Sequence, residues 1–201
     1  MFKPPVSIIA LILMSTLAAC APRAQAPDSW TLVSDASAIS FVTVKNGDVI
    51  EAHHFSDLSG TVSSDGAAQL TIQSASLETY IDIRNERVRD ILLQVTQFPF
   101  IEVSANLDAG EFGALLPGAP LRTEIEMLVT IAGTTRSLYA DVLVTRGDDG
   151  VSVATLEPVI VDMRDYGLGD AVEALRAIAN LDAITPAIAV SARLAFAPSD
   201  D

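Results

Sequence analysis

The sequence predicts a mainly β protein with two short helices, and three observations support this fold class. From about residue 30 onward, apolar and polar residues alternate in short segments, as they do in strands with one buried face. Turn signals such as Asn46-Gly47 separate these segments. Only 84–93 and 170–180 show the helical spacing of apolar residues. We therefore expect roughly eight or nine short antiparallel strands in a sandwich or a closed barrel, and closure would leave no free sheet edge.

The segment 1–19 is predicted to be a secretory signal peptide rather than part of the fold. Lys3 precedes an apolar run over 6–13, which is shorter than the roughly 20 residues of a membrane-spanning helix. Small residues then lead to Cys20, and this arrangement resembles the lipobox of bacterial lipoproteins, in which that cysteine carries a lipid. An ordinary leader followed by an unrelated cysteine is the alternative. Because Cys20 is the only cysteine, the chain has no internal disulfide and no cysteine-rich metal site.

We expect 20–29 to be a lipidated N-terminus and tether, and 30–198 to be one domain. The residue after Cys20 is Ala21 rather than Asp, which by resemblance to the sorting rules of enteric bacteria favours the outer membrane, on its periplasmic side. The formal net charge of the chain is −14, and loss of Lys3 with the leader makes it −15. Such an acidic protein is repelled by nucleic acid, so we exclude that class of partner.

In the first half of the chain, five alternating segments precede a helical one. The strands are predicted at 30–33, 39–44, 49–55, 58–62 and 69–73. Asn46-Gly47 and Ser64-Asp65-Gly66 supply turns between them. In 84–93, Val88, Ile91 and Leu92 have helical spacing, and Pro99 ends any helix there.

The second half is more regular. Further strands are predicted at 101–107, 121–131, 138–144, 151–156, 158–163 and 188–196, with a turn at 132–135. In 121–131, Ile125, Met127 and Val129 share one face, whereas Glu124 and Glu126 share the other. The helix over 170–180 has an apolar stripe formed by Val172, Leu175, Ile178 and Ala179.

Five groups of residues, spread over nearly the whole chain after the leader, form a recognisable pattern. The first two are Ser37-Ala38-Ile39-Ser40-Phe41 with Lys45, and 51–60 with His53-His54-Phe55 and Leu58-Ser59-Gly60. The third is Ser76-Leu77-Glu78-Thr79 with Arg84-Asn85-Glu86-Arg87, Asp90 and Phe98-Pro99. The last two are 128–135, which contains Ala132-Gly133-Thr134-Thr135, and Val159-Ile160-Val161-Asp162 with Asp165-Tyr166-Gly167-Leu168. In this order and spacing, they resemble the YceI-like family of exported proteins.

The resemblance implies a single antiparallel lipocalin-like β-barrel of about eight strands that carries a long isoprenoid or quinone-like lipid inside, and it is compatible with a homodimer. The lumen face is expected to be formed by apolar residues, namely Ile39, Phe41, Leu70, Ile125, Met127, Val129, Val142, Val190 and Leu194. Four polar residues are expected near the pocket mouth, namely His53, His54, Arg84 and Arg87. These arginines could hold a lipid headgroup, but we favour a connector in which nearby acids pair with them and lock the helix onto the barrel rim.

Two other classes of function are alternatives. The same apolar positions also suit a small barrel that is packed solid and acts through its surface, as an interaction or stress-protective module without a ligand. A hydrolase would need a histidine near both a serine and a carboxylate, and the sequence has neither a Gly-x-Ser-x-Gly motif nor a glycine-rich phosphate loop. Adjacent strand residues such as His53 and His54 point to opposite faces, so we expect no metal site. We therefore predict a binding protein, with no enzyme activity and no cofactor besides a bound lipid.

Overall fold

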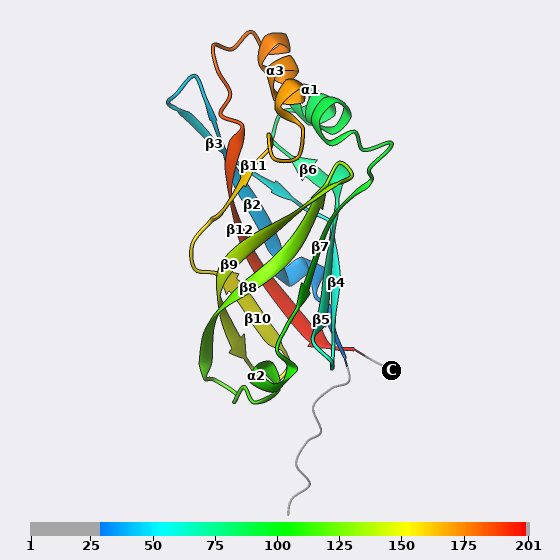
Figure 1. The fold of residues 1–201 in the computed structure, drawn as a ribbon, viewed down its shortest axis with the longest axis vertical. Coiled ribbons are helices and arrows are strands. Elements are labelled where there is room, and N and C mark those ends of the chain that lie inside the picture. The colour runs from blue at the N-terminus through cyan, green and yellow to red at the C-terminus, as the bar shows by residue number, and fades with distance from the viewer. Residues whose placement is uncertain (1–28, 200–201) are drawn as a thin grey trace, which may run out of the picture.

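Alternation of apolar and polar residues gives this chain its strands, because each strand buries one face inside a barrel and leaves the other in water. The computed structural model describes residues 29–199, in which twelve strand segments form one antiparallel sheet (Figure 1). The segments are β1 (Ser29–Leu32), β2 (Ala38–Lys45), β3 (Val49–Phe55), β4 (Leu58–Ser63), β5 (Ala67–Gln73), β6 (Leu77–Glu78), β7 (Phe100–Asn106), β8 (Pro120–Ile131), β9 (Thr134–Arg146), β10 (Val151–Thr155), β11 (Val159–Asp162) and β12 (Ala187–Pro198).

The twelve segments lie along eight lines, so the barrel has eight strands in the structural sense. Four lines are interrupted by a short turn or bend, and each is made of two segments: β1 with β2, β3 with β4, β5 with β6, and β10 with β11. Each line pairs with its neighbours in chain order, and β12 closes the ring by pairing with both β1 and β2. Closure leaves no long free edge, and the prediction of about eight antiparallel strands in a closed barrel is confirmed.

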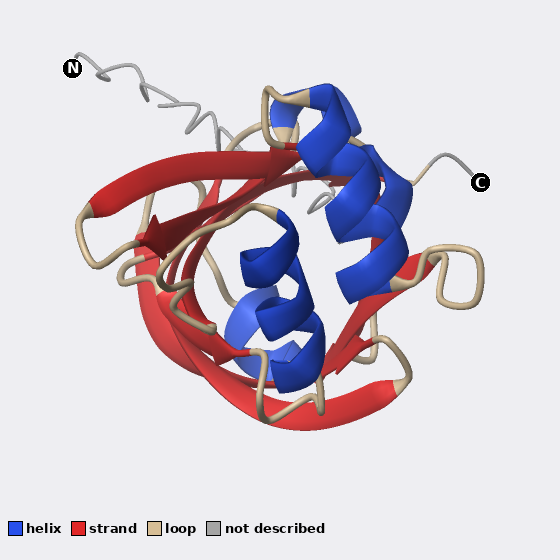
Figure 2. Ribbon diagram, turned by 90° about the horizontal axis from the view of Figure 1, so that it is seen from above, coloured by secondary structure: helices blue, strands red, loops and turns tan. Residues whose placement is uncertain are grey.

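Besides two single-turn 3-10 helices, Ser34–Ala36 and Ser74–Ser76, three helical regions sit at the two ends of the barrel. The helix α1 (Asp82–Arg87) continues directly into a π-helical segment, Val88–Leu93, and both lie at the same end as α3 (Gly169–Ile178) (Figures 1 and 2). The helix α2 (Ala109–Gly113) lies at the opposite end, where β1 begins and β12 finishes. Among these helices, none is long and apolar enough to cross a membrane.

The two helices predicted from sequence are present, but the third, α2, was missed. Its five residues are too few for a periodic apolar pattern to show. Its start is fixed instead by Asp108, whose carboxylate accepts hydrogen bonds from the backbone N–H groups of Gly110 (2.8 Å) and Glu111 (3.0 Å). The expectation of two helices is therefore corrected to three.

One strand is longer than the sequence pattern suggested. The predicted strand 138–144 extends to β9, which already starts at Thr134. The turn before it needs only Ala132 and Gly133, whose φ angles are +45° and +77°. A two-residue turn with both φ values positive matches the twist of the two strands it joins, so Thr134 and Thr135 belong to the sheet.

Candidate functional site

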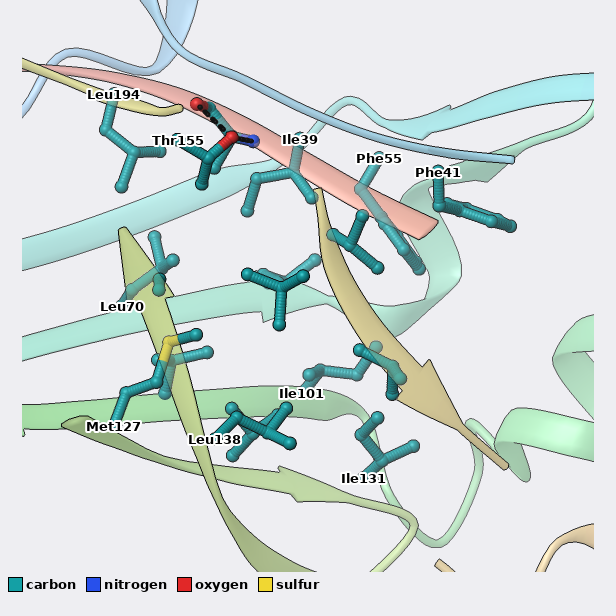
Figure 3. Close-up of a pocket in the computed structure, with 18 of the residues that line it drawn as sticks. Ile39, Phe41, Phe55, Leu70, Ile101, Met127, Ile131, Leu138, Thr155 and Leu194 are labelled. Carbon is teal, nitrogen blue, oxygen red and sulfur yellow. Dashed lines mark hydrogen bonds between the residues drawn. The ribbon is translucent and has the colours of Figure 1, made fainter. Parts of the chain in front are cut away.

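The barrel is hollow. A cavity of about 880 Å³ runs along its axis, and its lining reaches from Phe112 of α2 to Arg87 of α1 and Leu175 of α3. Figure 3 shows apolar side chains from several strands, among them Leu70, Met127 and Leu138, pointing into this space. The solid core expected by the alternative interpretation is therefore not what the strands enclose.

All nine apolar residues that the sequence placed on the lumen face line the cavity. They are Ile39, Phe41, Leu70, Ile125, Met127, Val129, Val142, Val190 and Leu194. They come from β2, β5, β8, β9 and β12, so the lining is assembled from strands far apart in the chain. The two-residue period of each strand fixes which face a residue occupies, and this is why sequence alone could identify them.

The middle of the cavity is lined mainly by apolar side chains. Thr155 is one of the few polar residues there, and its hydroxyl oxygen accepts a hydrogen bond from the backbone N–H of Ala192 at 3.2 Å (Figure 3). Its polar group is thus satisfied by the sheet itself, and little remains for water to bind.

The α2 end is covered mainly by apolar side chains. Phe112 and Leu115 line the cavity there together with Trp30 of β1. The guanidinium of Arg146 lies 6.0 Å from the Trp30 ring centroid, and its Nη1 donates to the backbone oxygen of Leu115 at 3.4 Å. This end therefore holds one cation, which is already engaged with an aromatic face and a carbonyl.

The α1 end is built around the carboxylate of Glu51. One of its oxygens lies 2.5 Å from Nζ of Lys45 and accepts a hydrogen bond from Nη1 of Arg84 at 2.7 Å. Arg84 also donates to the backbone oxygen of Thr79. Burial alone would raise the pKa of Glu51, but the hydrogen bonds from Lys45 and Arg84 outweigh it and hold that pKa below its ordinary value.

The next lumen-facing residue on β3 is His53, whose side chain is buried with only 4% exposure. Its Nε2 lies 3.0 Å from the hydroxyl oxygen of Thr43, and its ring packs against Phe41 with the ring centroids 5.3 Å apart and the ring planes tilted by 57°. Its Nδ1 is buried and has no hydrogen-bond partner among the described residues. Burial, together with the charge of Arg84, lowers the pKa of His53, so the ring is neutral at neutral pH.

The four polar residues expected at the mouth do not all face the cavity. His53, Arg84 and Arg87 line it, whereas His54 does not. Because His54 is the next residue on the same strand, its ring points to the other face, where Nδ1 lies 3.3 Å from the hydroxyl of Tyr80. The expectation that His54 lines the mouth is therefore corrected.

Arg84 does connect α1 to the barrel, but its partner is not one of the acids close to it in the sequence. Arg84 pairs with Glu51, which lies 33 positions earlier in the chain and on β3, and this pair ties α1 to the barrel. No ion pair joins Arg84 or Arg87 to Asp82, Glu86 or Asp90 among residues 29–199. Sequence distance suggested the wrong acids, because it does not show which strand the helix covers.

Sequence reasoning also missed Thr43, Lys45 and Glu51, which line the cavity. A signal for them was available. Continuing the alternation of Ile39 and Phe41 along β2 reaches Thr43 and Lys45, and counting back by two from His53 reaches Glu51. Across the part of the chain that the structure describes, no group of three or more His, Cys, Asp or Glu side chains is arranged to hold a metal ion.

These features define a hollow, eight-stranded barrel of the lipocalin-like class. The sequence profile of the YceI-like domain matches residues 30–196, and the chain belongs to that family. A search of curated proteins finds no match for the sequence.

Two solved structures show the same fold. One is a polyisoprenoid binding domain from Saccharophagus degradans, implicated in plant cell wall breakdown, which is 29% identical with a TM-score of 0.82 over 85% of this chain and 98% of that one. The other is BcnA from Burkholderia cenocepacia, which is 15% identical with a TM-score of 0.63 over 82% of this chain and 98% of that one. At that identity, the second structure supports the fold alone.

Proposed function

We propose that this protein binds one long isoprenoid-type lipid inside its barrel and acts as a carrier or store for it in the bacterial cell envelope. The observation that carries the proposal is the cavity of about 880 Å³, which runs the length of the barrel and is lined mainly by apolar side chains. A small barrel packed solid would leave no such space.

The energetics suit a long apolar tail. Burying one CH₂ group contributes about 0.8 kcal/mol, so each five-carbon isoprenoid unit would gain about 4 kcal/mol before the cost of ordering the chain. Such a tail needs no polar partner along most of the cavity, where the lining offers few. The description of the Saccharophagus degradans relative as a polyisoprenoid binding domain supports the same ligand class.

The proposed location rests on the sequence before the barrel. A signal peptide at 1–19 and acylation of Cys20 would anchor the protein on the periplasmic side, with the outer membrane favoured; these residues lie outside the described ones. The barrel begins at Ser29, at the α2 end (Figure 1). An anchor joined through the tether would thus attach the barrel near α2 and leave the α1 end away from the attachment point.

Native mass spectrometry tests the ligand directly. The mature protein, purified gently from its own kind of host, should carry one adduct per chain that extracts into organic solvent as a single isoprenoid species. A clean apo mass that stays unchanged after incubation with quinones and polyprenols would contradict the proposal. The same spectrum reports whether two chains associate, which the family resemblance leaves as a prediction.

A lumen-blocking substitution supplies the matched control. Ala140→Trp places a large ring in the cavity, since Ala140 is a small lining residue on β9. Leu128→Trp makes a similar change on the half-exposed outer face of β8. The adduct should disappear in the first variant and persist in the second.

A further inference from the structure

The ionisable side chains of the cavity are gathered at one end. Six ionisable residues line it, namely Lys45, Glu51, His53, Arg84, Arg87 and Arg146. Five of them belong to the α1 end, and the sixth, Arg146, is engaged at the α2 end by Trp30 and the Leu115 carbonyl. A cavity that held only a hydrocarbon would gain nothing from this asymmetry.

Four buried side-chain polar atoms have no hydrogen-bond partner among the described residues. Nε of Arg89 and the Tyr166 hydroxyl belong to side chains outside the cavity lining, whereas Nδ1 of His53 and Nε of Arg84 belong to side chains that line it at the α1 end. Buried polar atoms in folded proteins are almost always hydrogen-bonded, to protein groups or to something bound. These two atoms therefore point to a ligand group that sits at this end.

The chemistry of that group follows from the donors. Nε of Arg84 can only donate. Nδ1 of His53 donates when the Thr43 hydroxyl donates to Nε2, since a neutral imidazole carries a single N–H. Arg87 adds further donors and forms no ion pair within residues 29–199. The site is thus equipped to bind an oxygen that accepts hydrogen bonds.

The charge balance agrees with an acceptor. Lys45, Arg84 and Arg87 are positive, Glu51 is negative and His53 is neutral, so the end carries a formal charge of +2 by these groups (3 − 1). The whole chain has a net charge of −14. A positive site inside an acidic protein favours a ligand group with negative or partly negative oxygens and repels a cation.

The cavity reaches solvent at this end. Ile81 and Ile83 line the cavity although they are 47% and 52% exposed, so the lumen reaches solvent beside α1. A lipid that enters tail first through this opening leaves its head beside Arg84 and Arg87. The tail then extends toward Phe112 and Leu115 at the α2 end.

From these observations, we propose that the α1 end is a headgroup site that takes an oxygen acceptor, either a phosphate group or a quinone-type carbonyl, and thereby fixes the direction of the lipid in the barrel. This inference rests on the proposed function, because it assigns a head and an orientation to the lipid that the barrel would hold.

Tail-matched ligands test the headgroup site. Geranylgeranyl monophosphate, a quinone with the same four-unit tail and the headless hydrocarbon of that tail would be titrated against the mature protein. At least one headed ligand should bind about tenfold to a hundredfold more tightly than the hydrocarbon, as expected for buried hydrogen bonds to charged donors. Equal affinity for all three would overturn the headgroup site and leave lipid binding intact. Failure of all three to bind would overturn both proposals.

Variants separate the two headgroups. Arg84→Gln and His53→Phe should lower the affinity for the headed ligand much more than the affinity for the hydrocarbon. Arg87→Gln removes a charge without breaking any ion pair, so it should weaken a phosphate by about tenfold and a quinone hardly at all. Arg122→Gln is the control, since Arg122 is exposed on β8 and outside the cavity lining. Equal loss of all ligands in the three variants would contradict the proposal.

Photocrosslinking of the wild-type protein tests the orientation without any variant. A prenyl probe with a diazirine beside its phosphate should label peptides from 79–93, which include Arg84 and Arg87. Labelling confined to 105–115, around α2, would place the head at the wrong end and overturn the orientation.

Discussion

The two ends of the barrel are covered by helices of different kinds. At the α2 end, a five-residue helix covers the strands with Phe112. The cation that lines the cavity there, Arg146, already contacts the Trp30 ring and the Leu115 carbonyl. At the α1 end, two longer helical regions lie over a network centred on Glu51. The same sheet thus forms an apolar end and a polar end. The difference depends on which residues the last lumen-facing positions of each strand carry.

The largest expected effect comes from filling the space that the two ends share. Ala140→Trp should lower the affinity for any prenyl ligand by about a hundredfold or more, because the ring occupies volume that the tail needs. The free energy of unfolding should change little, since the ring enters an existing cavity rather than a packed core, where overpacking costs about 1–3 kcal/mol. Isothermal titration and chemical denaturation measure the two quantities.

The outer-face variant Leu128→Trp supplies the baseline for both measurements. If it weakened binding as much as Ala140→Trp, the ligand would not be inside the barrel.

The next largest effect is expected at the polar end. Glu51→Gln leaves Lys45 and Arg84 without their shared carboxylate, and it should lower the free energy of unfolding by about 1–2 kcal/mol, a modest value because these side chains are partly exposed. The loss should be greatest in α1, which hydrogen exchange followed by mass spectrometry would show.

Glu51 also gives a pH dependence with a definite sign. Its pKa is lowered in the folded state from 4.5, so its contribution is fully present above that value and is lost as the pH falls through the folded pKa. Below pH 5, the free energy of unfolding should therefore fall less steeply with decreasing pH in Glu51→Gln than in the wild type. Glu124→Gln, on the exposed face of β8, should keep the wild-type profile; an identical flattening there would contradict the role of Glu51.

A smaller effect is expected from His53. Burial and the nearby Arg84 lower its folded pKa below 6.5, so the folded state disfavours protonation. Stability should therefore decrease as the pH falls from 6.5 toward the folded pKa, and His53→Phe should remove this part of the pH dependence. Thermal unfolding between pH 7.5 and 5 measures it, with His54→Gln as the matched histidine variant outside the cavity. A profile that changed only in His54→Gln would refute the assignment.

The smallest effect belongs to the apolar end. Asp108→Ala removes the carboxylate that caps α2, and loss of such a cap costs about 0.5–2 kcal/mol in general. We expect the lower part of that range, because Asp108 is exposed and the helix is short. Backbone hydrogen exchange should become faster in α2 alone, and the ratio of the affinities for headed and headless ligands should not change. Asp149→Ala, in the exposed turn before β10, serves as the comparison; a lost preference in Asp108→Ala would mean that the two ends are coupled.

The sequence by itself determined which residues face inward. In β8, alternation assigned Ile125, Met127 and Val129 to the lumen, and the structure has them there, because a strand's period of two leaves no other choice once one face is buried. The same rule could have added Lys45 and Glu51. The same rule also excludes His54, because two adjacent residues of a strand cannot both face the cavity mouth.

Only the tertiary structure decided whether that inner face encloses a packed core or a cavity. The alternating pattern is the same in both cases, whereas the volume depends on how eight strands tilt and close around it. The partner of Arg84 was also beyond the sequence, since Glu51 lies on a strand that reaches α1 only after the barrel closes. The helix α2 escaped prediction because five residues make little more than one turn. Local periodicity sets the direction of a side chain, and long-range packing sets what it meets.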